Sequence, residues 1–302
     1  MNSAVSQQVS GQVSGLDRRL NAYRDDLADV NLKGRVEAAR FVDPVSMQVK
    51  VHFADVLDRP EEKGGLQTQF LYGHQVRMFD GKDGWAWVQG EDCGYVGYVR
   101  EECLCASIDS PLAATHMVRA PRTFLYCEPD LVRPRTGYRS IGSRLTVTDT
   151  VTVRGTDYVI LESGDAVIAK HVFPIGEWQT DPVAVAETLL HTPYLWGGNT
   201  GFGIDCSGLV LIANMACGQS VLRDSDMQAQ SVGERIETDF TNLQRGDLVF
   251  WKAHVGIMTD RDHLLHANGN TMNVALERLD EAIERIGYLY GPPTLVRRPE
   301  QG

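Results

Sequence analysis

One cysteine stands where a glycine-rich loop leads into a long apolar run. The run GIDCSG (residues 203–208) precedes LVLIANMACG, whose composition is that of a buried helix. The free N–H groups and the dipole at a helix start favour a negative charge, so a thiol at Cys206 is expected to ionise more readily than an ordinary one. A buried structural cysteine is the alternative interpretation, and the position alone leaves both open.

A nucleophilic cysteine needs a base, and two histidines follow it in apolar runs. His254 opens HVGIM, and His266 lies in LLHANG. Two adjacent antiparallel strands would set these imidazoles side by side, one as the base and the other holding its ring. A metal site made of Cys206, His254 and His266 is the competing interpretation, but zinc ligands usually include a closely spaced pair, and these residues do not.

The elements around these residues indicate an α+β domain over residues 177–302. Asp181 followed by Pro182 is typical of a helix start, and a second helix is predicted over CSGLVLIANMACG. DLVFWK, HVGIM and HLLHANG then predict three short strands. Helices followed by a sheet differ from the alternating order of a parallel β-α-β fold.

Two stretches of short strands precede this domain. Residues 39–110 alternate apolar and polar side chains from Val45 to Phe53 and continue in strands separated by Gly/Asp turns, which predicts a small β-barrel. Residues 111–176 repeat the pattern more weakly and predict a second barrel. Residues 1–38 form an N-terminal extension. Its first 15 residues are predicted to be disordered, and apolar spacing from Leu16 to Val30 predicts one or two short amphipathic helices.

The composition limits the classes of function. The 302 residues include 29 Lys and Arg against 40 Asp and Glu, a formal net charge of −11, which argues against nucleic-acid and membrane-surface binding. No run of about 18 apolar residues predicts a transmembrane helix. The first 20 residues lack the apolar core of a secretory signal, and the six cysteines include no CxxC. A cytoplasmic protein with reduced thiols is therefore expected.

Four blocks of the sequence resemble the NlpC/P60 cysteine peptidases, which have a papain-like fold and cut cell-wall peptides. The blocks are TPYLWGGNTGFGIDCSGLV, RDSDMQ, RGDLVFWKAHVGIM and LLHANG, in that order. QTQFLYGHQVRMFDGKDGWAWVQ and GYVGYV are similar to bacterial SH3-like domains. The combination resembles the γ-D-glutamyl-L-diamino acid endopeptidases, which implies two SH3-like barrels followed by a papain-like NlpC/P60 domain.

The resemblance implies roles for individual residues. Cys206 falls on the family's nucleophile, His254 on its base and His266 on the third residue that orients the base. Tyr194, in PYLWGG, falls on a tyrosine that lies near the thiolate and helps to hold the oxyanion.

The resemblance also implies a subsite for the substrate's free N-terminal L-Ala. Asp224 and Ser225, in RDSD, match the acidic element of that subsite. Tyr95 of the first barrel is the candidate for its aromatic wall, with Tyr98 as the alternative. A buried ammonium needs a carboxylate partner, and a barrel wedged against the groove would block longer chains. His74 is a departure, since relatives often carry an acidic residue there.

The expected activity is cleavage of the γ-D-glutamyl–diamino acid bond of short murein peptides during cell-wall peptide recycling. The expected partner is a small stem peptide, with no nucleic acid, no membrane, no metal and no organic cofactor. The residues assign neither a preferred diamino acid nor an oligomeric state. Two alternatives stay open: a wall-fragment binding protein with a vestigial catalytic domain, and a papain-like amidase or acyltransferase.

Overall fold

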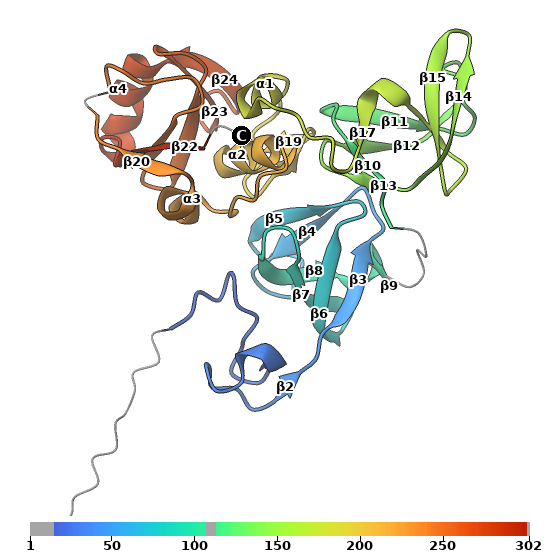
Figure 1. Ribbon diagram of the computed structural model, residues 1–302. Helices are drawn as coiled ribbons and strands as arrows, with labels where there is room; N and C mark the ends of the chain where they lie inside the picture. The colour runs from blue at the N-terminus through green and yellow to red at the C-terminus, as the bar shows by residue number, and fades with distance from the viewer. Residues whose placement is uncertain (1–14, 107–112, 239, 301–302) are drawn as a thin grey trace, which may run out of the picture.

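The computed structural model describes residues 15–106, 113–238 and 240–300 (Figure 1). Strands dominate these residues, and helices are few. A first β domain lies below two further lobes, a second β domain and a helix-containing lobe formed by the C-terminal third (Figure 1). The disorder predicted for the first residues lies outside the described residues up to position 14.

The N-terminal segment, residues 15–40, forms turns and short extended pieces in place of the predicted helices. Its elements are β1 (Ala28–Asp29) and η1 (Val30–Leu32), and β1 pairs in parallel with β2 (Phe41–Val42). Ala22 and Leu27 pack into one cluster with Phe79 and Trp87 of the first β domain. The helix prediction is wrong because this packing, rather than the periodicity, decides the backbone conformation.

The first β domain is one seven-stranded antiparallel sheet with open edges, ordered β5-β4-β8-β7-β6-β3-β9. A single strand was predicted over VSMQVKVHFADVL, but the chain leaves the sheet at residues 50–52 and returns as a second strand. The elements are β3 (Val45–Val49), β4 (Phe53–Leu57), β5 (Leu66–Leu71), β6 (Gln75–Lys82), β7 (Trp85–Gly90), β8 (Val96–Arg100), η2 (Glu101–Cys103) and β9 (Leu104–Ala106).

The second β domain consists of two separate open sheets, ordered β13-β10-β17 and β12-β11-β16-β15-β14. Its elements are β10 (His116–Val118), β11 (Arg122–Tyr126), β12 (Arg135–Ser140), β13 (Arg144–Leu145), β14 (Val147–Val153), β15 (Thr156–Leu161), β16 (Ala166–Ile168), η4 (Ala169–His171) and β17 (Val172–Pro174). The two β regions are therefore present as predicted, but the described strands do not close either of them into a barrel.

The C-terminal lobe has the predicted order of helices followed by a sheet. Its helices and short hairpin are α1 (Pro182–Glu187), β18 (Asn199–Thr200), β19 (Gly203–Ile204), α2 (Cys206–Met215) and α3 (Ser225–Ser231). Its sheet, ordered β20-β25-β21-β22-β23-β24, contains β20 (Glu234–Ile236), β21 (Leu248–Trp251), β22 (His254–Met258), β23 (His263–Asn268), β24 (Asn273–Arg278) and β25 (Leu295–Arg298). A further helix, α4 (Leu279–Tyr290), was not predicted.

The sheet of this lobe is covered on both faces. Leu248 and Phe250 of β21 pack with α2, whereas Val249 and Trp251 pack with α4. Successive residues of a strand point to opposite faces, so an almost wholly apolar strand such as DLVFW indicates two buried faces. None of the helices in the described residues is both long and apolar enough to cross a membrane.

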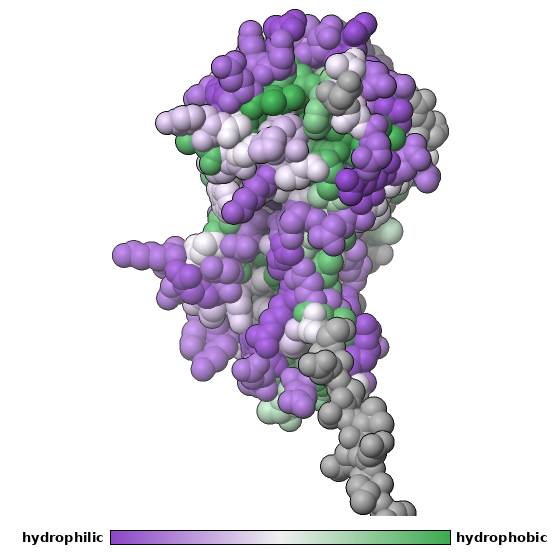
Figure 2. Space-filling model, turned by 90° about the vertical axis from the view of Figure 1, so that its left-hand side faces the viewer, coloured by the Kyte–Doolittle hydropathy of each residue, from purple (hydrophilic) through white to green (hydrophobic). Residues whose placement is uncertain are grey.

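Both β domains contact the loop that leads to Cys206. The backbone N–H of Asn199 donates to the Gln69 side chain of the first β domain at 3.0 Å, and the backbone N–H of Gly201 donates to Ser140 of the second at 2.9 Å. The loop is thereby held from two sides. The face of the molecule shown in Figure 2 is mostly hydrophilic, with small hydrophobic patches between polar side chains.

Candidate active site

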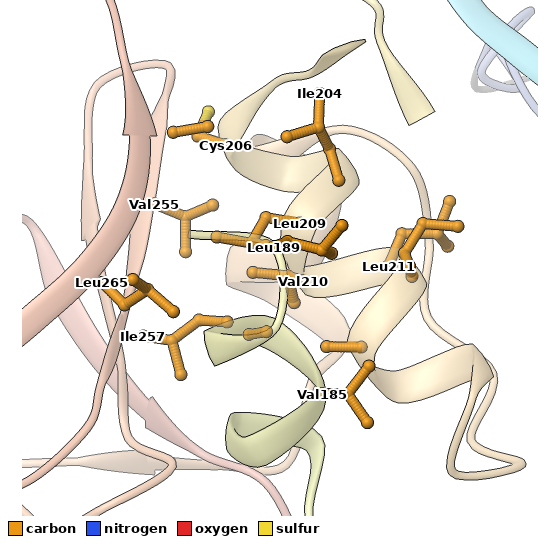
Figure 3. Packing of buried hydrophobic residues seen from close by; sticks show 14 of the residues in the cluster. Val185, Leu189, Ile204, Cys206, Leu209, Val210, Leu211, Val255, Ile257 and Leu265 are labelled. Atoms are coloured by element: carbon orange, nitrogen blue, oxygen red, sulfur yellow. The ribbon is translucent and has the colours of Figure 1, made fainter. Parts of the chain in front are cut away.

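Cys206 is the first residue of α2, and Asp205 caps the helix. One Asp205 oxygen accepts from Gly208 N–H at 2.7 Å, and the other accepts from Gly197 N–H at 2.8 Å. A Cβ at Gly208 would stand 2.4 Å from the Gly198 carbonyl oxygen, so only glycine lets the loop pass this close to the helix. The Cys206 sulfur points away from Leu209 and Val210, toward the edge of the core cluster (Figure 3).

A fully buried arginine, Arg223, fixes this helix start. Its guanidinium donates to both oxygens of Asp205 at 2.7 and 2.9 Å, and to the Ser207 hydroxyl at 2.8 Å. Its Nε donates to Thr68 Oγ1 of the first β domain at 2.8 Å. The first β domain is thus connected to the catalytic helix through one side chain. Arg223 was not predicted from the sequence, although it lies directly before Asp224 in the RDSD block.

The thiol of Cys206 is harder to ionise than its place at a helix start suggests. Burial, followed by the charge of Asp205, raises the pKa of Cys206 to about 12. The backbone N–H groups of Val255 and Ser207 and the charge of Arg223 act in the opposite direction but do not outweigh burial. Burial therefore outweighs the expected effect of the helix start on the Cys206 thiol, which favours transfer of its proton to a base during attack.

His254 and His266 lie on neighbouring antiparallel strands, and their rings meet. His254 begins β22, His266 lies in the middle of β23, and Ile257 pairs with Leu265 between them. The His254 Nε2 and His266 Nδ1 atoms are 2.7 Å apart. Since the Val255 N–H acts on the Cys206 sulfur, the start of β22 lies beside the thiol. Burial, followed by the charge of His266, lowers the pKa of His254 to about 3, so its ring is neutral.

Glu277 of β24 extends this pair to a chain of three groups and decides its tautomers. The His266 Nε2 lies 2.5 Å from Glu277 Oε1, and Arg285 of α4 pairs with the same oxygen. Burial opposes ionisation of Glu277, but the hydrogen bonds from His266 and Arg285 lower its pKa overall. A carboxylate only accepts, so His266 donates through Nε2. In a neutral His266 ring Nδ1 then accepts from His254 Nε2, which leaves Nδ1 of His254 as the nitrogen that can act as the base.

A cleft with a volume of about 380 Å³ brings four of the predicted site residues together: Tyr194, Cys206, Asp224 and Ser225. Its other lining residues, which were not predicted from the sequence, are Gln67, Trp196, Asp205, Ser207, Asp226, Lys252 and Ala253. Burial and the neighbouring Cys206 raise the pKa of the Tyr194 hydroxyl, so this group keeps its proton and can donate.

Asp224 lies at the N-cap of α3 and lines the cleft. The Tyr95 hydroxyl donates to Asp224 Oδ2 at 3.1 Å, and the Tyr95 side chain is almost fully buried. Tyr98, the alternative, interacts with Arg24 at 3.2 Å. Of the two tyrosines, the structure therefore brings Tyr95 to the carboxylate, and Ser225 follows it as the first residue of α3.

Comparison with known proteins identifies two regions of the chain. Residues 191–286 match the NlpC/P60 family, and residues 56–104 match the bacterial dipeptidyl-peptidase SH3 domain. The chain is 30% identical over 242 residues to the γ-D-glutamyl-L-lysine dipeptidyl-peptidase of Bacillus cereus, covering 73% of this chain and 70% of that protein. The chain belongs to the NlpC/P60 family of cysteine peptidases.

Other similarities are partial or concern the fold alone. Dipeptidyl-peptidase 6 of Lysinibacillus sphaericus is 35% identical over 116 residues, which are 38% of this NlpC/P60 chain and 41% of that protein. A crystal structure of an NlpC/P60 family protein from Bacillus cereus superposes with a TM-score of 0.71 at 21% identity. That match covers 84% of this chain and 99% of the other, and it shows the same fold.

His74, the departure noted in the sequence, does not line the cleft of this NlpC/P60 protein. Its Nδ1 lies 3.0 Å from Asp92, and its Nε2 lies 3.1 Å from the carbonyl oxygen of Gly142 in the second β domain. The side chain therefore joins the two β domains. Among the described residues, no group of three His, Cys, Asp or Glu side chains could hold a metal ion, Cys206 with His254 and His266 included.

Proposed function

We propose that this NlpC/P60 protein hydrolyses the bond between γ-D-Glu and the diamino acid of short murein peptides that begin with a free L-Ala. The similarity to the Bacillus cereus γ-D-glutamyl-L-lysine dipeptidyl-peptidase supports this substrate class. The observation that carries the proposal is a partly buried carboxylate, Asp224, in the same cleft as the Cys206 thiol.

A carboxylate at the end of a cleft selects for a positive group. An ammonium that leaves water needs a partner of opposite charge, and Asp224 is the acidic group that Tyr95 holds in place. Tyr95 belongs to the first β domain, so this domain stands where a longer chain would continue past the amine. In intact murein the L-Ala nitrogen is an amide rather than a free amine. The proposed substrate is therefore a released peptide, and recycling in the cytoplasm is the setting that we propose.

The geometry supports a covalent mechanism in two halves. In the first, the Cys206 proton passes to Nδ1 of His254 while the sulfur attacks the γ-carbonyl carbon of D-Glu. The carbonyl oxygen gains negative charge, and the backbone N–H of Cys206 and the Tyr194 hydroxyl are the proposed donors to it. His254 then returns its proton to the amine of the diamino acid as the C–N bond breaks, which leaves a thioester on Cys206.

In the second half, water takes the place of the amine. His254 Nδ1 removes a proton from the water as its oxygen attacks the thioester carbon, and the C–S bond then breaks. The products are L-Ala-D-Glu and a regenerated thiol. Throughout, Glu277 and His266 keep the base ring in one tautomer, and the half-buried Glu277 carboxylate compensates the positive charge that His254 carries between the steps.

Product analysis tests the proposal. The purified chain is incubated with L-Ala-γ-D-Glu-diaminopimelate and with its N-acetylated form, and the products are identified by mass spectrometry. The expected result is L-Ala-D-Glu plus diaminopimelate from the free peptide and at least tenfold lower kcat/KM for the acetylated one. The Cys206→Ala variant should lose more than about a hundredfold in rate.

The other outcomes support the alternatives. Binding of the peptide without turnover by the wild-type chain indicates a wall-fragment binding protein with a vestigial site. Cleavage of a different amide, or transfer of the acyl group to an added amine, indicates an amidase or acyltransferase. Equal turnover of the free and acetylated peptides removes the role given to Asp224 and Tyr95.

A further inference from the structure

The N-terminal segment reaches the cleft, although more than 200 residues separate the two in sequence. Its backbone is fixed on the first β domain: the Val96 N–H donates to the Arg19 carbonyl oxygen at 2.8 Å, and the Gln89 amide donates to the Leu20 carbonyl oxygen at 2.8 Å. Leu20 also packs against the apolar core of that domain. Arg19 is thus held by the same domain that supplies Tyr95.

The Arg19 guanidinium joins three carboxylates at the Asp224 end of the cleft. Its Nη1 donates to Asp224 Oδ2 at 2.8 Å, and its Nη2 donates to Asp226 Oδ2 at 2.8 Å. Asp17, on the same segment, accepts from Nη2 at 2.8 Å. Asp224 and Asp226 both line the cleft. Arg19 does not line it, but contacts these two lining residues from behind.

The contacts of Asp224 are one-sided. Oδ2 accepts from both Arg19 and Tyr95, whereas no described residue donates to Oδ1. Two donors on one oxygen fix the plane of the carboxylate and leave the second oxygen for a ligand. We propose that Arg19 is a positioning residue of the ammonium subsite: it holds Asp224 so that Oδ1 receives the substrate's free amine. This inference rests on the proposed function.

The charges around Asp224 give Arg19 a second effect. Burial raises the pKa of Asp224, and Arg223, Tyr95 and Arg19 oppose that rise. Asp226 lies across Arg19 and is held ionised mainly by it. Without Arg19, Asp224 loses one of these compensating groups and faces the uncompensated charge of Asp226, so it is protonated at higher pH. A protonated Asp224 holds an ammonium poorly.

In the opposite role, Arg19 competes with the substrate's amine for the Asp224 carboxylate and has to leave it before the amine binds. The two roles differ in sign. A positioning residue lowers KM, and its removal raises KM. A competitor raises KM, and its removal lowers KM.

The test compares Arg19→Ala and Arg19→Lys with wild type and with Arg18→Ala. Arg18 is the adjacent arginine, and it pairs at the surface with Asp25. The rate of hydrolysis of L-Ala-γ-D-Glu-diaminopimelate is measured from pH 5 to 9. For Arg19→Ala we expect about tenfold higher KM at pH 7, kcat within twofold, and an acid limb of kcat/KM about one pH unit higher. Arg19→Lys should recover most of the KM, and Arg18→Ala should behave as wild type.

Two results overturn the inference: a lower KM in Arg19→Ala, which assigns a competitor, or a KM and pH profile like those of Arg18→Ala, which assigns a structural role only. A second arm keeps the inference separate from the proposed function. Binding of the dipeptide L-Ala-D-Glu is measured by calorimetry in Cys206→Ala with and without Arg19→Ala. A tenfold weaker Kd in the double variant supports the inference even if the wild-type chain cleaves nothing, and an equal Kd contradicts it.

Discussion

The two ends of the active site are built in different ways. The base end lies beside the cleft and comes from one sheet: His254, which follows the lining residue Ala253, His266 and Glu277 lie on three consecutive strands, β22, β23 and β24. The end that holds Asp224 is assembled from three distant segments, since Arg19 belongs to the N-terminal segment, Tyr95 to the first β domain and Asp224 to the C-terminal lobe.

This difference in construction separates the residues that carry out the reaction from the residues that select the substrate. Neighbouring strands fix side-chain positions through the backbone ladder, which suits a proton chain whose atoms lie 2.5 to 2.7 Å apart. The Asp224 end depends on how separate domains pack, so it can differ between relatives without disturbing the reaction. Changes at the base end should therefore act on kcat, and changes at the Asp224 end should act on KM.

The largest effect is expected at Arg223, which holds the Asp205 cap beside Cys206. Arg223→Met leaves the buried Asp205 without its partner and should lower the free energy of unfolding by about 3–5 kcal/mol. Arg223→Lys keeps the charge and should lose less. Urea denaturation measures both. Arg245→Met is the control, because Arg245 forms exposed ion pairs with Asp181 and Glu187 and should cost about 1 kcal/mol or less. A loss below 1 kcal/mol for Arg223→Met contradicts the role of Arg223.

The next largest effect separates the ends in kinetics. Glu277→Gln removes the acceptor that fixes the tautomer of His266, so kcat should fall about a hundredfold while KM stays within threefold. Glu284→Gln, on the exposed face of α4, is the matched control and should leave both constants unchanged. Steady-state kinetics with the tripeptide measures both constants. A Glu277→Gln variant with a higher KM and an unchanged kcat would contradict the distinction between the two ends.

A smaller effect of the other kind is expected at Tyr95. Tyr95→Phe deletes one hydrogen bond to Asp224 and should raise KM about fivefold with kcat within twofold, which corresponds to about 1 kcal/mol. Tyr98→Phe is the control. Tyr98 lies in β8 of the same domain, and its hydroxyl contacts Arg24 instead of Asp224, so this variant should change neither constant. The comparison fails if the two phenylalanine variants are indistinguishable, or if Tyr95→Phe lowers kcat alone.

The smallest effect is a difference in pH dependence. The folded-state pKa of His254 lies below its usual value of 6.5, so the stability linked to its neutral ring is present above pH 6.5 and is lost as the pH falls toward about 3. The pKa of Asp224 is raised, so its protonation stabilises the folded chain as the pH falls. Between pH 7 and 5, His254→Gln should reduce the acid loss of unfolding free energy by about 2 kcal/mol, and Asp224→Asn should not. Urea titrations at pH 7, 6 and 5 measure this, and equal slopes for His254→Gln and wild type contradict it.

The difference between local and long-range contacts also explains which site residues could be predicted from the sequence. Cys206, His254 and His266 lie on elements with their own local signals, a capped helix and two short apolar strands, so their meeting follows from secondary structure. Glu277 and Arg223 carry no such signal, because a charged side chain pairs with whatever the tertiary fold brings near it. Their contacts become visible only in the structure.

Other predictions failed for related reasons. Burial of the Cys206 thiol depends on the packing of several elements, and it outweighs the local effect of the helix start. The apolar residues of the N-terminal segment have helical spacing, but Leu27 packs in a cluster with Trp87 of the first β domain, and the segment does not form a helix. Strand patterns at residues 39–176 identified the two β regions but not whether their sheets close, because closure depends on pairing between edge strands.

A crystal structure of the Cys206→Ala variant with L-Ala-γ-D-Glu-diaminopimelate bound tests most directly whether the cleft has one direction. We expect the L-Ala ammonium about 3 Å from Asp224, and the γ-carbonyl carbon of D-Glu beside residue 206 with the diamino acid on the His254 side. A peptide bound in the reverse direction, or one whose ammonium lies in solvent away from Asp224, contradicts the account.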